Sequence, residues 1–301
     1  MLDIIIRAGS FVAIILLGFF LRKIGYFKQE DFHTLSKIVI RITLPASIIA
    51  GYAGNQVDTT MLALFWLGLG FGVLYMLVGW LMQRRNNAEQ KAFYVLNLPG
   101  YNIGNFASPF IEGFFGSAGV VVTSLFAAGN AFVCMGGALG VASMIRSGVG
   151  FDGKRLGKAL LTSVPFLCYT SMTLLNLLNI RLPEPVITFA EIVGSANAFI
   201  AMLLLGIGFE LSGRGRVKQI LKILIPRYAI ATVLAVVCYF LLPFSLEARQ
   251  TVVILLFSPI TSAVPAFTGQ IGGDTGLSST INSISIVCSI TIYVILFSIM
   301  V

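Results

Sequence analysis

The chain has 301 residues, of which 57% are hydrophobic and 11% are charged, and its mean hydropathy is +0.94. About a quarter of the residues of a soluble globular domain are charged, so this composition excludes a soluble globule and predicts an integral membrane protein. The net charge of +8 is interpreted in terms of membrane topology, because the sequence has no basic tail with interspersed aromatic residues that would indicate a nucleic-acid partner.

Ten apolar segments are long enough to cross a bilayer, since a hydrocarbon core of about 30 Å requires roughly 20 apolar residues per helix. In chain order they lie near 4–21, 34–53, 60–82, 92–115, 118–145, 159–179, 186–210, 220–242, 248–271 and 277–301. The sequence therefore predicts an all-α integral membrane fold with ten transmembrane helices.

The connections between these segments alternate in positive charge. One set contains fifteen basic residues: Arg22, Lys23, Lys28, Lys37, Arg84, Arg85, Lys91, Arg146, Lys154, Arg155, Lys158, Arg214, Arg216, Lys218 and Lys222. The opposite set contains only Arg181 and Arg249. Because basic loops stay in the cytoplasm, this pattern predicts a multi-pass protein of the cell membrane with both termini outside. Arg7, Arg41 and Arg227 fall within or at the ends of spans, where they either snorkel or hold an anion.

The most polar linker, 146–158, divides the ten spans into five and five. Because five is odd, the second half must run opposite to the first. This predicts two inverted five-helix repeats, 1–145 and 159–301, joined by a cytoplasmic linker at 146–158. The fourth span of each half carries the same spacing of helix-breaking residues: Pro109, Gly113 and Gly116 in one half, and Pro265, Gly269 and Gly272 in the other.

These two spans are predicted to be interrupted, near 99–105 and 259–265, and to cross each other, because proline removes a backbone donor and glycine loosens a helix. Backbone groups freed in hydrocarbon are costly unless they line a cavity, and half-helix N-termini are partly positive, so the crossing is expected to bind an anion. The expected substrate-binding residues are the polar ones in and after the breaks: Asn102, Asn105, Ser108, Asn130, Thr261, Ser262 and Asn282. A purely structural role is the alternative for each, since Ser and Thr bond their own helix and Asn joins helices.

Glu112, Glu191 and Gln270 are the candidates for ion coupling. The two acids fall toward the outer ends of their spans, where interfacial capping is the alternative. The four cysteines are scattered singly and there is one histidine, so no metal site and no cofactor is predicted, apart from H⁺ or Na⁺ as a coupling ion. The string IGGDTG around Asp274 has Ile where an aspartyl protease motif needs Gly, and no nucleophile is paired with a histidine, so no enzyme is predicted.

Two stretches carry a resemblance to a known family: LLGFFLRKIGYFKQEDFHTLSKIVIRITLPASIIAG near the N-terminus and YNIGNFASPFIEGFFG at the first break. They resemble the opening and the fourth helix of the auxin efflux carrier family, which includes bacterial malate or malonate permeases. On this match Asn102 takes the place of the family's crossover asparagine, and Pro109 and Pro265 take those of its fourth-helix and ninth-helix prolines. The resemblance implies ten helices in two inverted repeats, related to bile acid sodium symporters, with the fourth and ninth helices crossing at the substrate site. Ser108 stands where many members have Gly, which leaves the substrate open.

The sequence thus predicts a secondary active transporter of a small organic anion, a carboxylate or an auxin-like acid, that works by alternating access at this crossing. Proton coupling, sodium coupling and uncoupled efflux are all left open. A sodium-coupled bile acid-type symporter is one alternative. A channel is a weaker one, because channels usually repeat a filter around a symmetry axis. The expected partners are the substrate and the lipid bilayer, with a homodimer as a candidate assembly.

Overall fold

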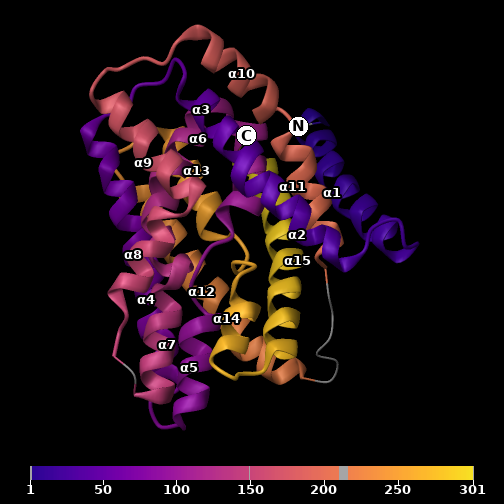
Figure 1. Ribbon diagram of the computed structural model, residues 1–301, viewed down its shortest axis with the longest axis vertical. Helices are drawn as coiled ribbons and strands as arrows, with labels where there is room; N and C mark the ends of the chain where they lie inside the picture. Colours follow the sequence, from indigo (N-terminus) through magenta and orange to yellow (C-terminus); the bar gives the residue numbers. More distant parts are fainter. Residues whose placement is uncertain (1, 149, 210–215, 301) are drawn as a thin grey trace.

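The computed structural model describes residues 2–148, 150–209 and 216–300 (Figure 1). Over these residues the secondary structure is helical, without strands, as the composition predicts. Six helical segments are long and apolar enough to cross a membrane: Glu30–Tyr52, Thr59–Met82, Ile103–Ser147, Glu184–Ile207, Val217–Leu241 and Thr275–Met300. The pair Gly153–Leu161 and Val164–Leu177, bent by 72°, gives a seventh when it is counted as one span. These helices make the chain a multi-pass membrane protein.

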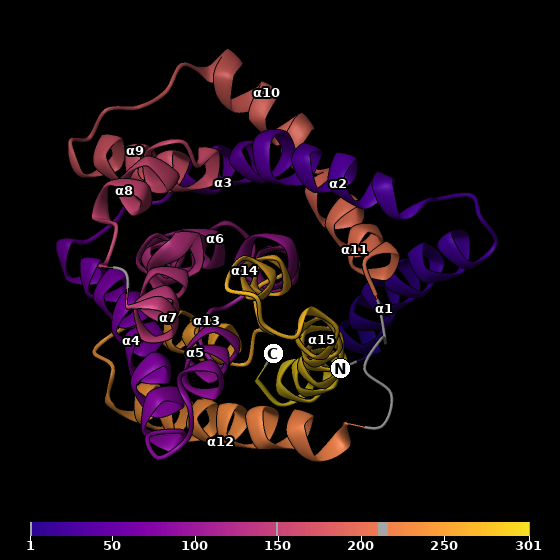
Figure 2. The ribbon, with the colours of Figure 1, turned by 60° about the horizontal axis from the view of Figure 1, so that its bottom comes forward.

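The helices form two groups, which are seen side by side in Figure 2. The first group, which we call the arc, curves around one side of the molecule. It consists of α1 (Leu2–Lys23), α2 (Gln29–Ile38), η1 (Val39–Thr43), α3 (Leu44–Tyr52), α8 (Gly153–Leu161), α9 (Val164–Leu177), α10 (Glu184–Gly194) and α11 (Asn197–Ile207).

The second group, which we call the inner bundle, lies within the curve of the arc (Figure 2). It consists of η2 (Thr59–Leu62), α4 (Ala63–Met82), α5 (Ala88–Asn97), η3 (Ile103–Ala107), α6 (Ser108–Phe132), η4 (Val133–Gly137), α7 (Ala138–Ser147), α12 (Val217–Leu241), α13 (Leu246–Leu256), α14 (Val264–Gln270) and α15 (Thr275–Met300). Each group therefore takes helices from both halves of the chain.

Within each group, glycines let the backbones of neighbouring helices touch. In the arc, a Cβ at Gly206 of α11 would lie within 3.0 Å of the backbone of α1 at Ile15. In the inner bundle, a Cβ at Gly68 of α4 or at Gly129 of α6 would meet the backbone of the other helix equally closely. Small residues bring membrane helices together in this way, because van der Waals packing replaces the hydrophobic effect inside lipid.

Between the two groups, the glycines meet side chains instead. A Cβ at Gly104 of η3 would lie 2.9 Å from Leu44 Cδ2 of α3, and one at Gly113 of α6 would lie 2.8 Å from Phe11 Cζ of α1. Among the described glycines, those that face the backbone of another helix lie within one group. Backbone-to-backbone packing is thus confined to the interior of each group.

The inner bundle contains two non-helical stretches at the places where the sequence predicts interruptions. The first lies between the end of α5 at Asn97 and the start of η3 at Ile103, and we call it break 1. The second lies between the end of α13 at Leu256 and the start of α14 at Val264, and we call it break 2. Break 1 contains Gly100, whose φ of +83° favours glycine at that position.

The prolines and glycines of the repeated spacing lie beside the breaks and not inside them. Pro265 is in the first turn of α14, where a missing N–H leaves no helical bond unmade. Pro109 lies at the junction of η3 and α6, inside the helical segment that begins at Ile103. The residues that open the helices are Pro99 and Gly100 in break 1 and Pro259 in break 2. Pro265 therefore starts its half-helix, whereas Pro109 lies more than one turn inside the half-helix that begins at Ile103.

The four glycines of the spacing have separate roles. Gly116, with φ of +58°, turns the chain in the middle of α6, so the residues before and after it form two helices. Gly113 packs against α1, Gly269 lies beside Thr275, and Gly272, with φ of +63°, turns the chain after α14. Each of these positions is a turn or a close approach.

Candidate functional site

The two breaks are in direct contact. The backbone N–H of Asn102 in break 1 donates to the carbonyl oxygen of Pro259 in break 2 at 2.9 Å. This bond satisfies one of the backbone groups that each interruption frees, as a buried backbone requires. It also brings residues of the two halves of the chain to one point in the inner bundle.

An asparagine from the following helix supports each break. Asn130 of α6 binds Tyr101, accepting its N–H at 3.4 Å and donating to its carbonyl oxygen at 3.1 Å. Asn282 of α15 donates to the carbonyl oxygens of Ile260 at 2.7 Å and Thr261 at 3.2 Å. Polar side chains thus replace the helical hydrogen bonds that the breaks lack.

A small cavity, which we call the central cavity, lies beside the contact between the breaks. Its volume is about 30 Å³, which leaves room for about one or two water molecules. From the inner bundle it is lined by Asn102, Asn105, Ser262, Asn282 and Ile286, and from the arc by Phe32, Leu204, Leu205 and Gly208. The central cavity therefore lies between the two groups of helices, and four of the seven predicted substrate-binding residues line it.

Two polar atoms of the cavity residues have no partner. Asn102 Nδ2 and Asn105 Oδ1 are buried and make no hydrogen bond, and the whole Asn102 residue is only 4% exposed. Buried amide groups are costly to leave unpaired, so such atoms indicate a place where a ligand or water binds. Asn102 offers a donor and Asn105 an acceptor, which suits a small polar molecule that is held by hydrogen bonds.

The other predicted binding residues lie outside this lining. Ser108 is buried at the start of α6, and Asn130 uses its amide on Tyr101. Thr261 lines a separate cavity of about 10 Å³ together with Gly100 and Cys134. The structure thus brings Asn102, Asn105, Ser262 and Asn282 together and places the other three nearby.

The three candidates for ion coupling have different surroundings. Glu112 of α6 is half-buried and accepts a hydrogen bond from Ser47 Oγ of α3 at 2.8 Å, and the Asn197 side chain of α11 faces the same carboxylate. Glu191 of α10 is exposed. Gln270 is exposed and accepts from Arg155 Nη2 at 2.8 Å. Of the three, Glu112 is the carboxylate that joins the inner bundle to the arc.

No cluster of three or more His, Cys, Asp or Glu side chains occurs in the part of the chain that the structure describes. The polar groups beside the Glu112 carboxylate are instead the hydroxyl of Ser47 and the side-chain amide of Asn197. Thr43 Oγ1 adds a second hydroxyl, which donates to Asn197 Oδ1 at 3.0 Å. A carboxylate in such surroundings can carry a proton.

Arg227 of α12 was open to two interpretations from sequence, and the structure excludes snorkelling. Its residue is 1% exposed, so the guanidinium does not reach the membrane surface. It donates to the carbonyl oxygens of Leu98 and, at 2.8 Å, of Gly100 in break 1, and to that of Ser258 in break 2 at 2.9 Å. The one sign of this role in the sequence is an arginine within an apolar span. Two of the carbonyl groups that Arg227 binds lie more than a hundred residues away in the chain.

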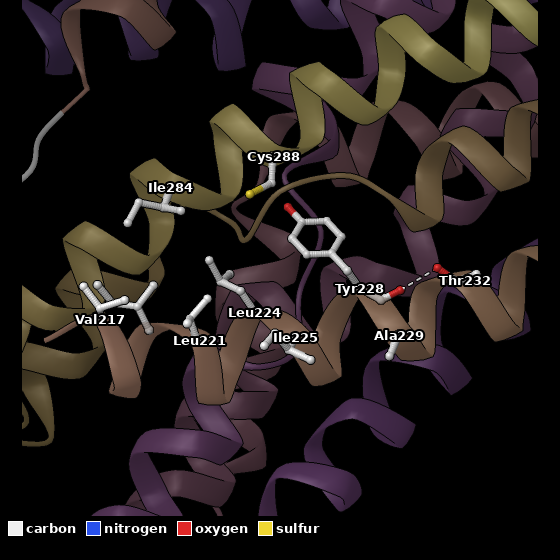
Figure 3. A pocket seen from close by; sticks show the side chains of 10 residues that line it. Val217, Leu221, Leu224, Ile225, Tyr228, Ala229, Thr232, Ile284 and Cys288 are labelled. Carbon is white, nitrogen blue, oxygen red and sulfur yellow. Dashed lines mark hydrogen bonds between the residues drawn. The ribbon is translucent and has the colours of Figure 1, made fainter.

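A larger groove lies on the other side of α15 and has a different character (Figure 3). Its volume is about 510 Å³, and it is lined by aliphatic side chains of α12 and α15 with Tyr228 as its main polar member. The Tyr228 hydroxyl is already used, since it donates to the Ser285 carbonyl oxygen at 2.8 Å. With no charged lining residue, the groove suits an acyl chain better than a polar solute.

Part of the chain matches a known protein family. Residues 9–144 match the membrane transport protein family. No curated protein matches.

The matched segment begins in α1 and ends in α7, so it contains break 1, Asn102, Asn105 and Glu112. Break 2 and the residues that support it lie outside the match. The match indicates a membrane transport protein and supports the resemblance of this half of the chain to auxin efflux carriers. The two breaks contact each other, so the unmatched half completes the site that the matched half begins.

The support of break 2 gives a stability prediction. Asn282→Leu leaves the carbonyl oxygens of Ile260 and Thr261 unpaired, and each unpaired buried acceptor costs about 1–3 kcal/mol. For a protein of this size we expect the unfolding temperature to fall by about 5–10 °C, measured by fluorescence in detergent. Thr291→Leu, an exposed position on the same helix, is the control and should leave it unchanged. Equal unfolding temperatures for both variants would contradict the supporting role of Asn282.

Proposed function

We propose that this protein is a secondary active transporter of a small organic anion, a carboxylate or an auxin-like acid, with its substrate site at the central cavity. The observation that carries the proposal is the unpartnered, buried amide of Asn102 at a cavity between two contacting breaks. Non-helical backbone at membrane depth is tolerated where it lines a cavity, and this is typical of substrate sites in transporters. The family match of residues 9–144 supports the same class.

Alternating access follows from the position of the cavity between the arc and the inner bundle. Pockets that hold small organic molecules usually have several hundred Å³, so about 30 Å³ is too small for a carboxylate substrate. We take this conformation as a closed state. The inner bundle then moves against the arc, in an elevator-like or rocking motion, to open the cavity to one side of the membrane and then to the other.

A ten-span topology is part of the proposal. The helices can be joined into ten spans, in order: α1, α2 with α3, α4, α5 with the start of α6, the rest of α6 with α7, α8 with α9, α10 with α11, α12, α13 with α14, and α15. The breaks then fall in the fourth and ninth spans of two inverted repeats, 1–145 and 159–301. The start of α1 and the end of α15 lie at the same end of the molecule, in keeping with both termini outside (Figure 1).

The test is counterflow in proteoliposomes. Proteoliposomes that contain the purified protein are loaded with one unlabelled carboxylate at a time. Uptake of the same compound in labelled form is then followed with imposed pH, sodium or potential gradients. We expect saturable counterflow of at least one small carboxylate, with protein-free liposomes as the blank. If no carboxylate moves, the organic-anion proposal fails. Sodium-dependent uptake confined to bile acids would favour the symporter alternative, and flux without counterflow would favour a channel.

Coupling of transport to protons is proposed to run through Glu112, because its carboxylate lies between α6 of the inner bundle and α3 and α11 of the arc. In Glu112→Gln we expect uptake driven by a pH gradient to fall about tenfold or more, while counterflow stays within about twofold. Glu191→Gln, at an exposed position on α10, is the matched control and should keep both activities. Undiminished gradient-driven uptake in Glu112→Gln would remove Glu112 from the coupling step.

A further inference from the structure

The side chain of Arg227 connects the ends of two half-helices. Leu98, whose carbonyl oxygen accepts from Arg227 Nη1, is the C-cap residue of α5. Ser258, which accepts from Nη2, directly follows Phe257, the C-cap residue of α13. The guanidinium therefore lies where the last carbonyl groups of both first half-helices point, together with the carbonyl of Gly100.

Helix C-termini are partly negative, and each is equivalent to about half an elementary charge. Two of them, from α5 and α13, add up to about one negative charge, which a guanidinium balances. No carboxylate lies within ion-pair distance of Arg227 among the described residues, so an acidic side chain does not use this charge. Two tyrosine rings, Tyr75 and Tyr101, instead cover the guanidinium at 5.4 Å from each ring centre.

The opposite ends of the interrupted spans lie at the central cavity. Asn102 is the N-cap residue of η3, which continues into α6, and its unpartnered amide nitrogen is buried in the cavity lining. Gly100, a partner of Arg227, is two residues before Asn102, and the Asn102 N–H donates to Pro259, the residue after Ser258. The hydrogen-bond partners of Arg227 thus lie within four residues of the cavity lining, and all of them are backbone carbonyl groups.

We infer that Arg227 makes the central cavity selective for anions: its charge cancels the negative ends of α5 and α13, so the positive end of η3 and α6 acts on the cavity unopposed. This inference takes the central cavity as the substrate site of the proposed function. Arg227 is a positioning residue, since it acts through the half-helices and the field they produce. Without its charge, two negative helix ends would offset the positive end that faces a bound carboxylate.

The experiment measures the potential in the cavity directly and needs no substrate. Ser262→Cys is introduced after Cys134, Cys168, Cys238 and Cys288 are replaced by serine. The thiol at position 262 is then reacted with two methanethiosulfonates of similar size, one carrying a sulfonate and one carrying a trimethylammonium group. The ratio of the two rate constants, corrected for reaction with a free thiol, reports the sign of the local potential.

We expect the ratio to favour the anionic reagent with Arg227 in place. Arg227→Gln should lower it on the order of tenfold, and Arg227→Lys, which keeps the charge, should stay within about twofold of the parent. Arg249→Gln is the matched control. Arg249 also donates to a backbone carbonyl, that of Tyr239 at 2.9 Å, and its guanidinium also lies over the Tyr239 ring. It differs in lying at the end of α13 that is far from break 2. The control should leave the ratio unchanged.

Three results would overturn the inference: an unchanged ratio in a folded Arg227→Gln, an equal loss in Arg227→Lys, or a ratio that favours the cationic reagent with Arg227 present. The last result decides the question even if Arg227→Gln does not fold. The outcome is independent of the transport assay. If carboxylate counterflow occurs but Arg227→Gln does not change the ratio, the inference is wrong and the proposed function stands. If the ratios are as expected but no counterflow occurs, the proposed function is wrong and the inference about the potential stands.

Discussion

Asn102→Ala is expected to remove most of the transport activity while the protein stays folded. The Asn102 Nδ2 atom has no partner within the protein, so its loss breaks no internal side-chain bond. The backbone bonds of Asn102, from its N–H to Pro259 and to its carbonyl from Ala107, are kept by alanine. A hydrogen bond to a charged ligand is worth about 1.5–3 kcal/mol, so we expect the initial rate of counterflow at low substrate concentration to fall about 10- to 150-fold.

Two comparisons make this result specific. Asn86→Ala, at an exposed position before α5, should leave counterflow unchanged, because that asparagine bonds only to nearby Gln83. The unfolding temperature of Asn102→Ala should stay close to that of the parent protein. If counterflow by Asn102→Ala equals that of the parent, Asn102 does not contact the substrate. If the variant unfolds early, the amide has a structural role instead.

Gly68→Ala is expected to destabilise the protein strongly, because it adds a methyl group where two helices of the inner bundle touch. A Cβ at position 68 of α4 would lie within 3.0 Å of the carbonyl oxygen of Phe126 in α6, and backbone cannot rotate away as a side chain can. The two helices would have to separate, which would also open the close contact between Gly129 of α6 and the backbone of α4 at Phe65. Overpacking of this kind costs about 1–3 kcal/mol or more, so we expect the unfolding temperature to fall by about 5–10 °C.

Gly70→Ala is the matched control, two residues along the same helix. Nothing lies within 4 Å of a Cβ at position 70, so the added methyl group meets only lipid or solvent. Alanine is favoured over glycine in a helix by about 1 kcal/mol, which predicts an unfolding temperature equal to or slightly above that of the parent. Similar losses for both variants would show that helix packing at Gly68 is not the cause.

Composition and local residue type were enough to predict the helical membrane fold and the position of the two breaks. Proline and glycine act on their own backbone, so their effect can be read along the chain. The non-helical residues lie at 98–102 and 257–263, close to the predicted 99–105 and 259–265. The two prolines of the repeated spacing do not open the helices. Pro265, at the end of the second predicted interruption, lies in the first turn of α14, and Pro109, beyond the first one, lies at the junction of η3 and α6.

The site could be predicted less completely, because it depends on contacts between distant parts of the chain. Arg227 and Gly100 are 127 residues apart, and no local pattern indicates that they meet. Glu112 and Glu191 looked equivalent in sequence, as acids near the outer ends of their spans. The first faces the arc and the second is exposed, a difference that depends on how the helices are rotated against their neighbours.

The distribution of the close glycine contacts has a mechanical consequence. Inside the arc and inside the inner bundle, backbone lies against backbone, and such surfaces fit in one register only. Across the boundary, glycines such as Gly104 and Gly113 lie against the tips of Leu44 and Phe11, which can change rotamer. Each group is therefore packed rigidly within itself, while the contacts between the two groups are made by side chains that can adapt to a change in their relative position.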